Sequence, residues 1–176
     1  IRSLGALYSP TTGIVDYVQV ATAMADVVRD RGGEVMTSTR VTGIEETAHG
    51  VTITAGDERI RARHVIAAAG LQADRIAQLC GVETDVRVVP FRGEYYRLRP
   101  DKDDIVNHLI YPIPSPDLPF LGVHLTRMIG GYVTVGPNAV LAFAREGYGF
   151  GTFNLRDINE MLRFPGFRNV IRTHFK

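Results

Sequence analysis

The chain has 176 residues, 45% of them hydrophobic and 22% charged. This balance supports a buried core and argues against disorder, and the length suits one domain or two small ones. The formal net charge is +1, and no basic block marks a nucleic-acid-binding surface. The single cysteine, Cys80, can build neither a disulfide framework nor a cysteine zinc site, so we assign no metal site. It fits a cytoplasmic location, or the inner face of a membrane, under reducing conditions.

The first eighty residues predict a helix followed by short strands. Asp16 is a candidate N-cap for a helix through Arg31, which Gly32-Gly33 would end. β-branched residues around a turn at Gly56-Asp57 predict an antiparallel meander, and the uninterrupted apolar run at 64–68 predicts a strand buried on both faces. The expected strands are 34–39, 41–44, 51–54, 59–63 and 64–68, and a second helix covers 73–80.

The second half of the chain predicts an antiparallel sheet followed by helices. Gly130-Gly131 is expected to close a hairpin between strands at 120–125 and 132–135. The other expected elements are strands at 86–90, 93–98 and 105–111, a proline-rich loop at 112–119, a short helix at 137–143, and helices at 156–162 and 166–175. We therefore predict an α+β fold, in which an incomplete α/β layer precedes an antiparallel-sheet part with C-terminal helices, with a boundary near residue 86.

Three alanines and a glycine follow the apolar run, in the sequence Val65-Ile66-Ala67-Ala68-Ala69-Gly70. In open α/β sheets, ligands bind beyond the carboxyl ends of the strands, and small side chains there let a ligand approach the backbone. Tight packing between a strand and the next helix would select the same small residues. The pattern by itself leaves both a ligand-binding and a structural interpretation open.

Five blocks of the sequence together resemble one protein family. They are LYSPTTGIVDY (7–17), VIAAAGLQADRIA (65–77), VPFRGEYYRL (89–98), IYPIPSPDLPFLGVHLTR (110–127) and GPNAVLAFAREGY (136–148). In this order the blocks resemble the FAD-dependent L-2-hydroxyglutarate oxidases and dehydrogenases, a branch of the D-amino-acid-oxidase-like flavoproteins. Because they span most of the chain, they are more specific than a lone glycine motif.

The resemblance implies a flavoenzyme that oxidises a 2-hydroxy diacid, L-2-hydroxyglutarate, to the 2-oxo acid by hydride transfer to FAD. It also implies that residues 1–85 are part of the FAD-binding domain and residues 86–176 are the substrate-binding domain. The family's GxGxxG fingerprint is absent from these residues, and the glycines at 147, 149 and 151 have the wrong spacing for it. We therefore expect an internal portion of a longer protein, with weak or no FAD binding and no turnover by itself.

For this reaction the resemblance implies a base, groups that bind carboxylates, and small residues beside the flavin. His124 is the candidate base, although a core histidine bonded to a backbone carbonyl would fit the same apolar strand. Strand alternation puts Tyr95 and Tyr96 on opposite faces, so we expect at most one of them in a pocket. The candidates for substrate binding are Arg92, Tyr95, Tyr96, Arg127 and Thr12, and those for cofactor contact are Val41, Ala69 and Gly70. The two arginines could equally be solvated surface residues.

Two other functions also fit the sequence: an amine or glycerol-phosphate oxidase of the same superfamily, and a non-catalytic binding or assembly domain. A diacid requires two carboxylate-binding groups, whereas an amine substrate requires one, so the pocket distinguishes the two enzymes. The expected partner is a small dicarboxylate and not nucleic acid. The electron acceptor, oxygen or a membrane quinone, does not follow from the sequence. Unpaired strand edges in a partial sheet would favour self-association.

Overall fold

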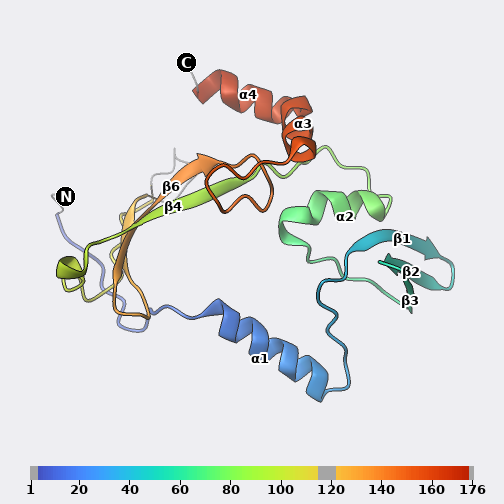
Figure 1. Cartoon of the computed structure of the whole chain (residues 1–176), viewed down its shortest axis with the longest axis horizontal. Coiled ribbons are helices and arrows are strands. Elements are labelled where there is room, and N and C mark those ends of the chain that lie inside the picture. The colour runs from blue at the N-terminus through green and yellow to red at the C-terminus, as the bar shows by residue number, and fades with distance from the viewer. Residues whose placement is uncertain (1–3, 115–121, 175–176) are drawn as a thin grey trace. The chain divides into compact units, whose positions relative to one another are not determined.

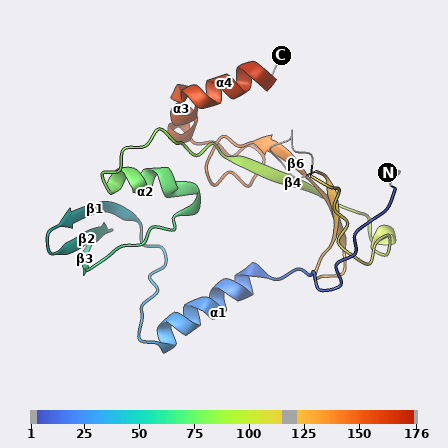
Figure 2. The ribbon, with the colours of Figure 1, turned by 180° about the vertical axis from the view of Figure 1, so that it is seen from behind.

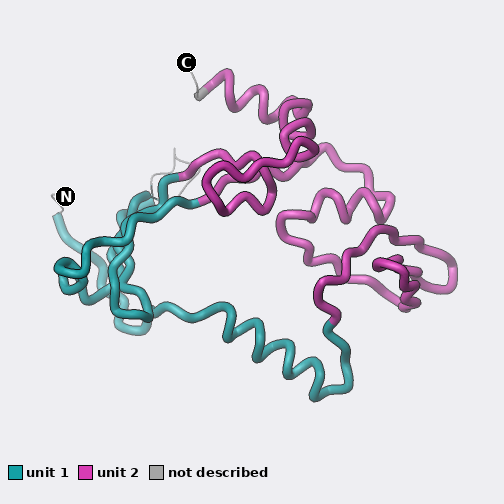
Figure 3. The backbone as a smooth tube through the Cα atoms, in the orientation of Figure 1, with its two compact units in different colours: residues 1–35, 93–138 teal, residues 36–92, 139–176 magenta. Residues whose placement is uncertain are grey.

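The computed structural model describes residues 4–114 and 122–174 (Figures 1 and 2). Its helices and antiparallel sheets confirm the mixed α+β fold class. The chain divides into two compact units, each built from two stretches of sequence (Figure 3). The first unit comprises Ile1–Val35 and Gly93–Asn138, and the second comprises Met36–Arg92 and Ala139–Lys176. The functional domains expected on either side of residue 86 stay a prediction, because these units describe compactness and not binding.

The first unit begins with a helix, α1 (Tyr17–Asp30), as the sequence predicted. Asp16 is its N-cap, because its carboxylate accepts hydrogen bonds from the backbone N–H groups of Val18 and Gln19. Gly32, with φ +79°, follows the helix in the left-handed conformation that glycine tolerates best. No residue of α1 is buried.

A three-stranded sheet with the order β4-β6-β5 supplies the strands of the first unit. Its strands are β4 (Phe91–Arg97), β5 (His124–Arg127) and β6 (Val133–Leu141), and a short 3₁₀ helix, η2 (Pro100–Lys102), follows β4. β5 and β6 pair antiparallel, with His124 opposite Gly136, across a turn that contains Gly130-Gly131, which confirms the predicted hairpin. Alternation along β5 buries His124 and Thr126, whereas Arg127 on the other face is half-buried.

The second unit contains the predicted meander, a three-stranded antiparallel sheet in the order β1-β2-β3. Its strands are β1 (Val41–Thr47), β2 (Gly50–Ala55) and β3 (Glu58–Ala62). Gly56, with φ +62°, occupies the turn between β2 and β3. The register of β1 on β2 shifts between Val41 and Gly43, so the first residues of β1 depart from regular pairing.

Helices follow the meander and end the described chain in the second unit. They are η1 (Gly70–Gln72), a 3₁₀ turn, and α2 (Ala73–Leu79), α3 (Leu155–Arg163) and α4 (Pro165–His174). The Asn154 side chain caps α3 by accepting a hydrogen bond from the backbone N–H of Asp157 at 3.2 Å. α3 packs against α4, and each contributes one buried apolar residue, Met161 and Phe167. The predicted second helix and the two predicted C-terminal helices are therefore confirmed within the described residues.

Four segments predicted as strands adopt other conformations. They are 34–39, 64–68, 86–90 and, apart from an isolated bridge at Ile110, 105–111. The apolar run at 64–68 is not buried either, since Ile66 is 94% exposed. A strand needs a neighbour that accepts its backbone hydrogen bonds, and none of these segments has a continuous partner strand in the described part of the chain. In these segments a strand-like amino-acid composition is therefore not enough to form a strand.

The predicted short helix at 137–143 is also wrong. Residues 137–141 continue strand β6, and Phe143 forms an isolated bridge with Phe153. Pairing within the β4-β6-β5 sheet overrides the local preference of this segment, as tertiary contacts commonly do. Most of the predicted proline-rich loop, the start of the first hairpin strand and the last residue of the C-terminal helix lie outside the described residues.

Candidate functional site

A pocket of about 640 Å³ in the first unit is lined by the buried histidine of β5 and by residues of the neighbouring elements. We call it the His124 pocket, and its polar lining includes Tyr95, Tyr111, His124, Thr126 and Thr134. The strand segments β4, β5 and β6 each contribute a hydroxyl or an imidazole to it. Residues 14–17, just before and at the start of α1, line it as well. The pocket therefore gathers groups that can donate hydrogen bonds around a single histidine.

His124 is 6% exposed, and its Nδ1 lies 3.0 Å from the carbonyl oxygen of Gly122. A carbonyl oxygen can only accept, so in the neutral imidazole the proton sits on Nδ1. Nε2 then keeps its lone pair and can accept a proton. The backbone contact expected of a core histidine is therefore present, and the same contact orients the ring as a base requires.

Two aromatic rings fix the plane of the His124 imidazole. Tyr111 stacks on it with ring centroids 4.2 Å apart and planes inclined by 20°, and Tyr95 meets it edge-on at 5.9 Å and 69°. Burial raises the pKa of Tyr95, and the neighbouring Tyr111 raises it further. The Tyr95 hydroxyl therefore stays protonated at neutral pH and can donate a hydrogen bond.

Sequence reasoning missed Tyr111, because it lies in a segment expected to be a regular strand. Of the two adjacent tyrosines, Tyr95 lines the pocket and Tyr96, which is 67% exposed, does not. This agrees with the expectation that at most one of them faces a pocket. Thr12 is exposed, donates a hydrogen bond to Ser9 Oγ at 2.7 Å and does not line the pocket.

Arg127 lies on the opposite face of β5 from His124 and is engaged elsewhere. Its Nη1 donates hydrogen bonds to the carbonyl oxygens of Asp103 at 3.0 Å and Val106 at 3.4 Å. These contacts tie the loop after η2 to β5. No arginine or lysine among the described residues lines the His124 pocket, so its hydrogen-bond donors are hydroxyls. Arg92 is half-buried on the part of β4 that belongs to the second unit.

The candidate cofactor residues lie along a groove of about 1080 Å³ in the second unit. We call it the Val41 groove; Val41 and Ala69 line it together with residues of α2 and of the segment 144–157. Gly70 directly follows Ala69 with φ +50° and begins η1. The structure therefore brings Val41 and Ala69 to one groove and places Gly70 at the turn beside it.

The Val41 groove has two features that could serve a flat ligand, although most of its lining is polar or charged. Ala69 presents only a methyl group, and the irregular start of β1 leaves part of its main chain without regular pairing. Such main chain can hydrogen-bond a ligand edge while a small side chain leaves room for a ring. These residues fit one portion of FAD, and we found no phosphate-binding glycine loop in the sequence.

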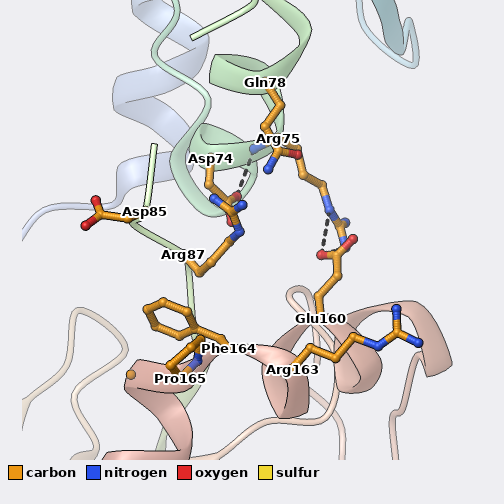
Figure 4. Close-up of a pocket in the computed structure, with 10 residues that line it drawn as sticks. Asp74, Arg75, Gln78, Asp85, Arg87, Glu160, Arg163, Phe164 and Pro165 are labelled. Atoms are coloured by element: carbon orange, nitrogen blue, oxygen red, sulfur yellow. Dashed lines mark hydrogen bonds and ion pairs between the residues drawn. The ribbon is translucent and has the colours of Figure 1, made fainter. Parts of the chain in front are cut away.

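Five charged residues form a cluster at this groove, three of them (Arg75, Arg145 and Asp157) in its lining, and sequence reasoning missed it. We call it the Arg145 cluster, and it consists of Asp74, Arg75, Arg145, Asp157 and Glu160. Arg75 Nη2 lies 2.5 Å from Asp157 Oδ1 and 2.6 Å from Glu160 Oε2. Figure 4 shows Arg75 and Glu160 facing one another from α2 and α3. The cluster therefore joins two helices that lie about eighty residues apart in the sequence.

Asp74 accepts hydrogen bonds from several parts of the second unit. Burial by itself would raise its pKa, but the hydrogen bond from the Arg145 side chain and that from the Val88 N–H outweigh burial and lower the pKa to about 2. Burial likewise opposes the shift at Asp157, where the Arg145 backbone N–H and the Arg75 side chain lower the pKa. Both carboxylates are therefore ionised at neutral pH.

Comparison with known proteins assigns this chain to a family. Residues 2–173 match the family of FAD dependent oxidoreductases named DAO. The chain belongs to this family. It is 49% identical over 177 residues to L-2-hydroxyglutarate dehydrogenase of Escherichia coli K12, a match that covers all of this chain and 42% of that protein.

Further relatives give the same result. The chain is 50% identical over 175 residues to L-2-hydroxyglutarate dehydrogenase of Salmonella houtenae, covering 99% of this chain and 42% of the relative. It is 44% identical over 184 residues to the mitochondrial L-2-hydroxyglutarate dehydrogenase of Nematostella vectensis, covering 97% of this chain and 40% of the relative. The chain thus spans about two fifths of the length of these curated relatives, and the family resemblance is confirmed. No helix among the described residues is long and apolar enough to cross a membrane.

Proposed function

We propose that this chain is part of an FAD-dependent dehydrogenase that oxidises the 2-hydroxy diacid L-2-hydroxyglutarate to the 2-oxo acid. The observation that carries the proposal is the orientation of His124, whose Nδ1 is engaged by the Gly122 carbonyl so that Nε2 remains free to accept a proton in a pocket rich in hydroxyl groups. Membership of the FAD dependent oxidoreductase family and 49% identity to a protein named L-2-hydroxyglutarate dehydrogenase support this reaction.

Oxidation of a secondary alcohol to a ketone removes a proton from the hydroxyl and a hydride from the carbon. In this proposal His124 Nε2 accepts the hydroxyl proton, and the aromatic rings of Tyr95 and Tyr111 hold the imidazole plane in place. FAD, when bound, supplies the acceptor for the hydride. In this proposal the hydroxyls of Tyr95, Tyr111 and Thr126, which line the pocket, donate hydrogen bonds to the substrate carboxylates.

For the cofactor, we propose that the second unit contributes the Val41 groove. Val41 would contact the ligand through its main chain, while Ala69 and Gly70 would keep side-chain bulk away from it. A Cβ at Gly70 would meet no atom of the chain within 4 Å. Glycine is therefore favoured here by the backbone φ of +50°, and not by a close contact within the chain. The chain by itself is expected to bind FAD weakly, because it has no GxGxxG phosphate loop.

Substrate-dependent reduction of the flavin in the full-length protein tests the proposed function. Under anaerobic conditions, L-2-hydroxyglutarate should bleach the visible absorbance of the oxidised flavin, whereas glycerol 3-phosphate and sarcosine should not. Bleaching by sarcosine or glycerol 3-phosphate, with none by L-2-hydroxyglutarate, would assign the protein to another oxidase class. A full-length protein that binds no flavin would overturn the proposal altogether.

We also propose that the 176-residue chain self-associates when produced alone. Large apolar side chains are exposed on α1, among them Tyr17, Val18 and Met24, and segments such as 34–39 have no partner strand among the described residues. Light scattering should therefore report a mass well above 19.4 kDa. A monomer that persists as the concentration rises would contradict this.

A further inference from the structure

The Arg145 side chain is 3% exposed and connects three parts of the second unit. Its Nη2 donates to Asp74 Oδ2 at 2.8 Å, and its Nη1 contacts the other oxygen of the same carboxylate. Its backbone N–H donates to Asp157 Oδ2 at 2.8 Å. Arg145 therefore links the loop after β6 to both α2 and α3.

Arg145 also makes one contact with an uncharged group. Nη1 also donates to the carbonyl oxygen of Leu71 at 2.6 Å. Leu71 is the middle residue of η1, so this bond fixes the orientation of a peptide plane within the turn that follows Ala69. The same turn is closed by a hydrogen bond of 2.9 Å from the Gln72 N–H to the Ala69 carbonyl.

Apolar packing does little to hold this turn. No residue of η1 is buried, and the only buried residue of α2 is a carboxylate, Asp74. A buried ion pair contributes little net stability compared with apolar residues of the same volume, but its directional hydrogen bonds select one geometry. The hydrogen bonds of Arg145 to Leu71 and Asp74 therefore help to set the position of η1 and of the start of α2.

We propose that Arg145 is a positioning residue that holds the Ala69–Gly70–Leu71 turn in the shape that receives the cofactor at the Val41 groove. This inference rests on the proposed function, because that function places FAD beside Ala69 and Gly70. Arg145 itself acts through the Leu71 carbonyl and the Asp74 carboxylate. Lysine could keep an ion pair with Asp74, but a single ammonium cannot reproduce the planar, forked contacts to the carboxylate and the carbonyl.

The test compares Arg145→Lys and Arg145→Met with Glu160→Gln in the full-length apoprotein. Glu160→Gln is the matched control, because Glu160 belongs to the same cluster and accepts from Arg145 at 3.3 Å but is not bonded to η1. The dissociation constant of FAD is measured by the quenching of flavin fluorescence, and amide hydrogen exchange is followed at residues 69–72. Circular dichroism verifies that each variant folds. If Arg145→Met does not fold, the test relies on Arg145→Lys.

We expect Arg145→Lys to weaken FAD binding at least tenfold and to accelerate amide exchange at residues 69–72, whereas Glu160→Gln changes the FAD affinity less than twofold. An unchanged FAD affinity in Arg145→Lys would overturn the proposal. Weaker binding with unchanged exchange at the turn would also overturn it, because that result indicates a direct contact of Arg145 with the ligand at the groove. An equal loss of affinity in Glu160→Gln would overturn it as well, because that result indicates a general effect on stability. If the wild-type protein binds no FAD, the proposed function fails first, and this inference fails with it.

Discussion

His124 Nδ1 and the carbonyl oxygen of Gly122, two residues earlier in the chain, lie 3.0 Å apart. This short-range contact sets the tautomer of the imidazole, and the stacked ring of Tyr111 sets its plane. A histidine held in this way has its Nε2 lone pair aimed in a fixed direction. The buried state of His124 is thus compatible with a role as proton acceptor.

Replacement of His124 by glutamine in the full-length enzyme should lower kcat by about a hundredfold or more, because the variant has no group able to accept the proton. The measurement is steady-state turnover with L-2-hydroxyglutarate, together with the flavin content of each preparation. His108→Gln is the matched control, since His108 is exposed in the same unit and does not line the pocket. A loss under threefold with normal flavin content would remove His124 from the role.

Tyr95→Phe and Tyr111→Phe should each raise KM about three- to tenfold, because each removes one hydrogen-bond donor worth about 1 kcal/mol while keeping the ring beside His124. Tyr96→Phe should leave KM unchanged, because the Tyr96 side chain is 67% exposed and does not line the His124 pocket. Equal KM values in all three variants would show that these hydroxyls do not bind substrate.

Asp74 should make the protein sensitive to acid. Its pKa is lowered from 3.8 to about 2 in the folded state, so the stability it contributes is fully present above about pH 4 and is lost as the pH falls through 2. The contribution is on the order of 2 kcal/mol. Asp74→Asn should lower the thermal midpoint at neutral pH and flatten its fall between pH 4 and pH 2.

The control for this prediction is Asp26→Asn. Asp26 forms an ion pair of 2.8 Å with Arg29 on α1, but both side chains are more than half exposed. Such a surface pair contributes little to stability, so the variant should unfold like the wild type at every pH. An Asp74→Asn variant with the wild-type pH profile would contradict the assignment of acid sensitivity to Asp74.

Arg127→Met should destabilise the full-length protein by about 1 to 3 kcal/mol, because the carbonyl oxygens of Asp103 and Val106 lose their charged donor. The free energy of unfolding is measured in urea, and KM for substrate is measured in parallel. A tenfold rise in KM without loss of stability would instead support the sequence-based expectation that Arg127 binds substrate.

The sequence by itself determined the features that depend on near neighbours. The cap at Asp16, the meander of β-branched residues and the opposite facing of Tyr95 and Tyr96 all follow from interactions within a few residues or from strand alternation. The five sequence blocks likewise led to the correct family, because their residues and their order along the chain can be compared without a structure.

Only the tertiary structure decided what depends on distant partners. Whether 64–68 is a strand depends on a neighbour for its backbone hydrogen bonds, and composition cannot supply one. The contact of Arg145 with Asp74 spans 71 positions, and the stacking of Tyr111 on His124 depends on where a loop folds back. Neither has a periodic signal in the sequence, because charge pairing and ring stacking are set by the distance between side chains in space and not by spacing along the chain.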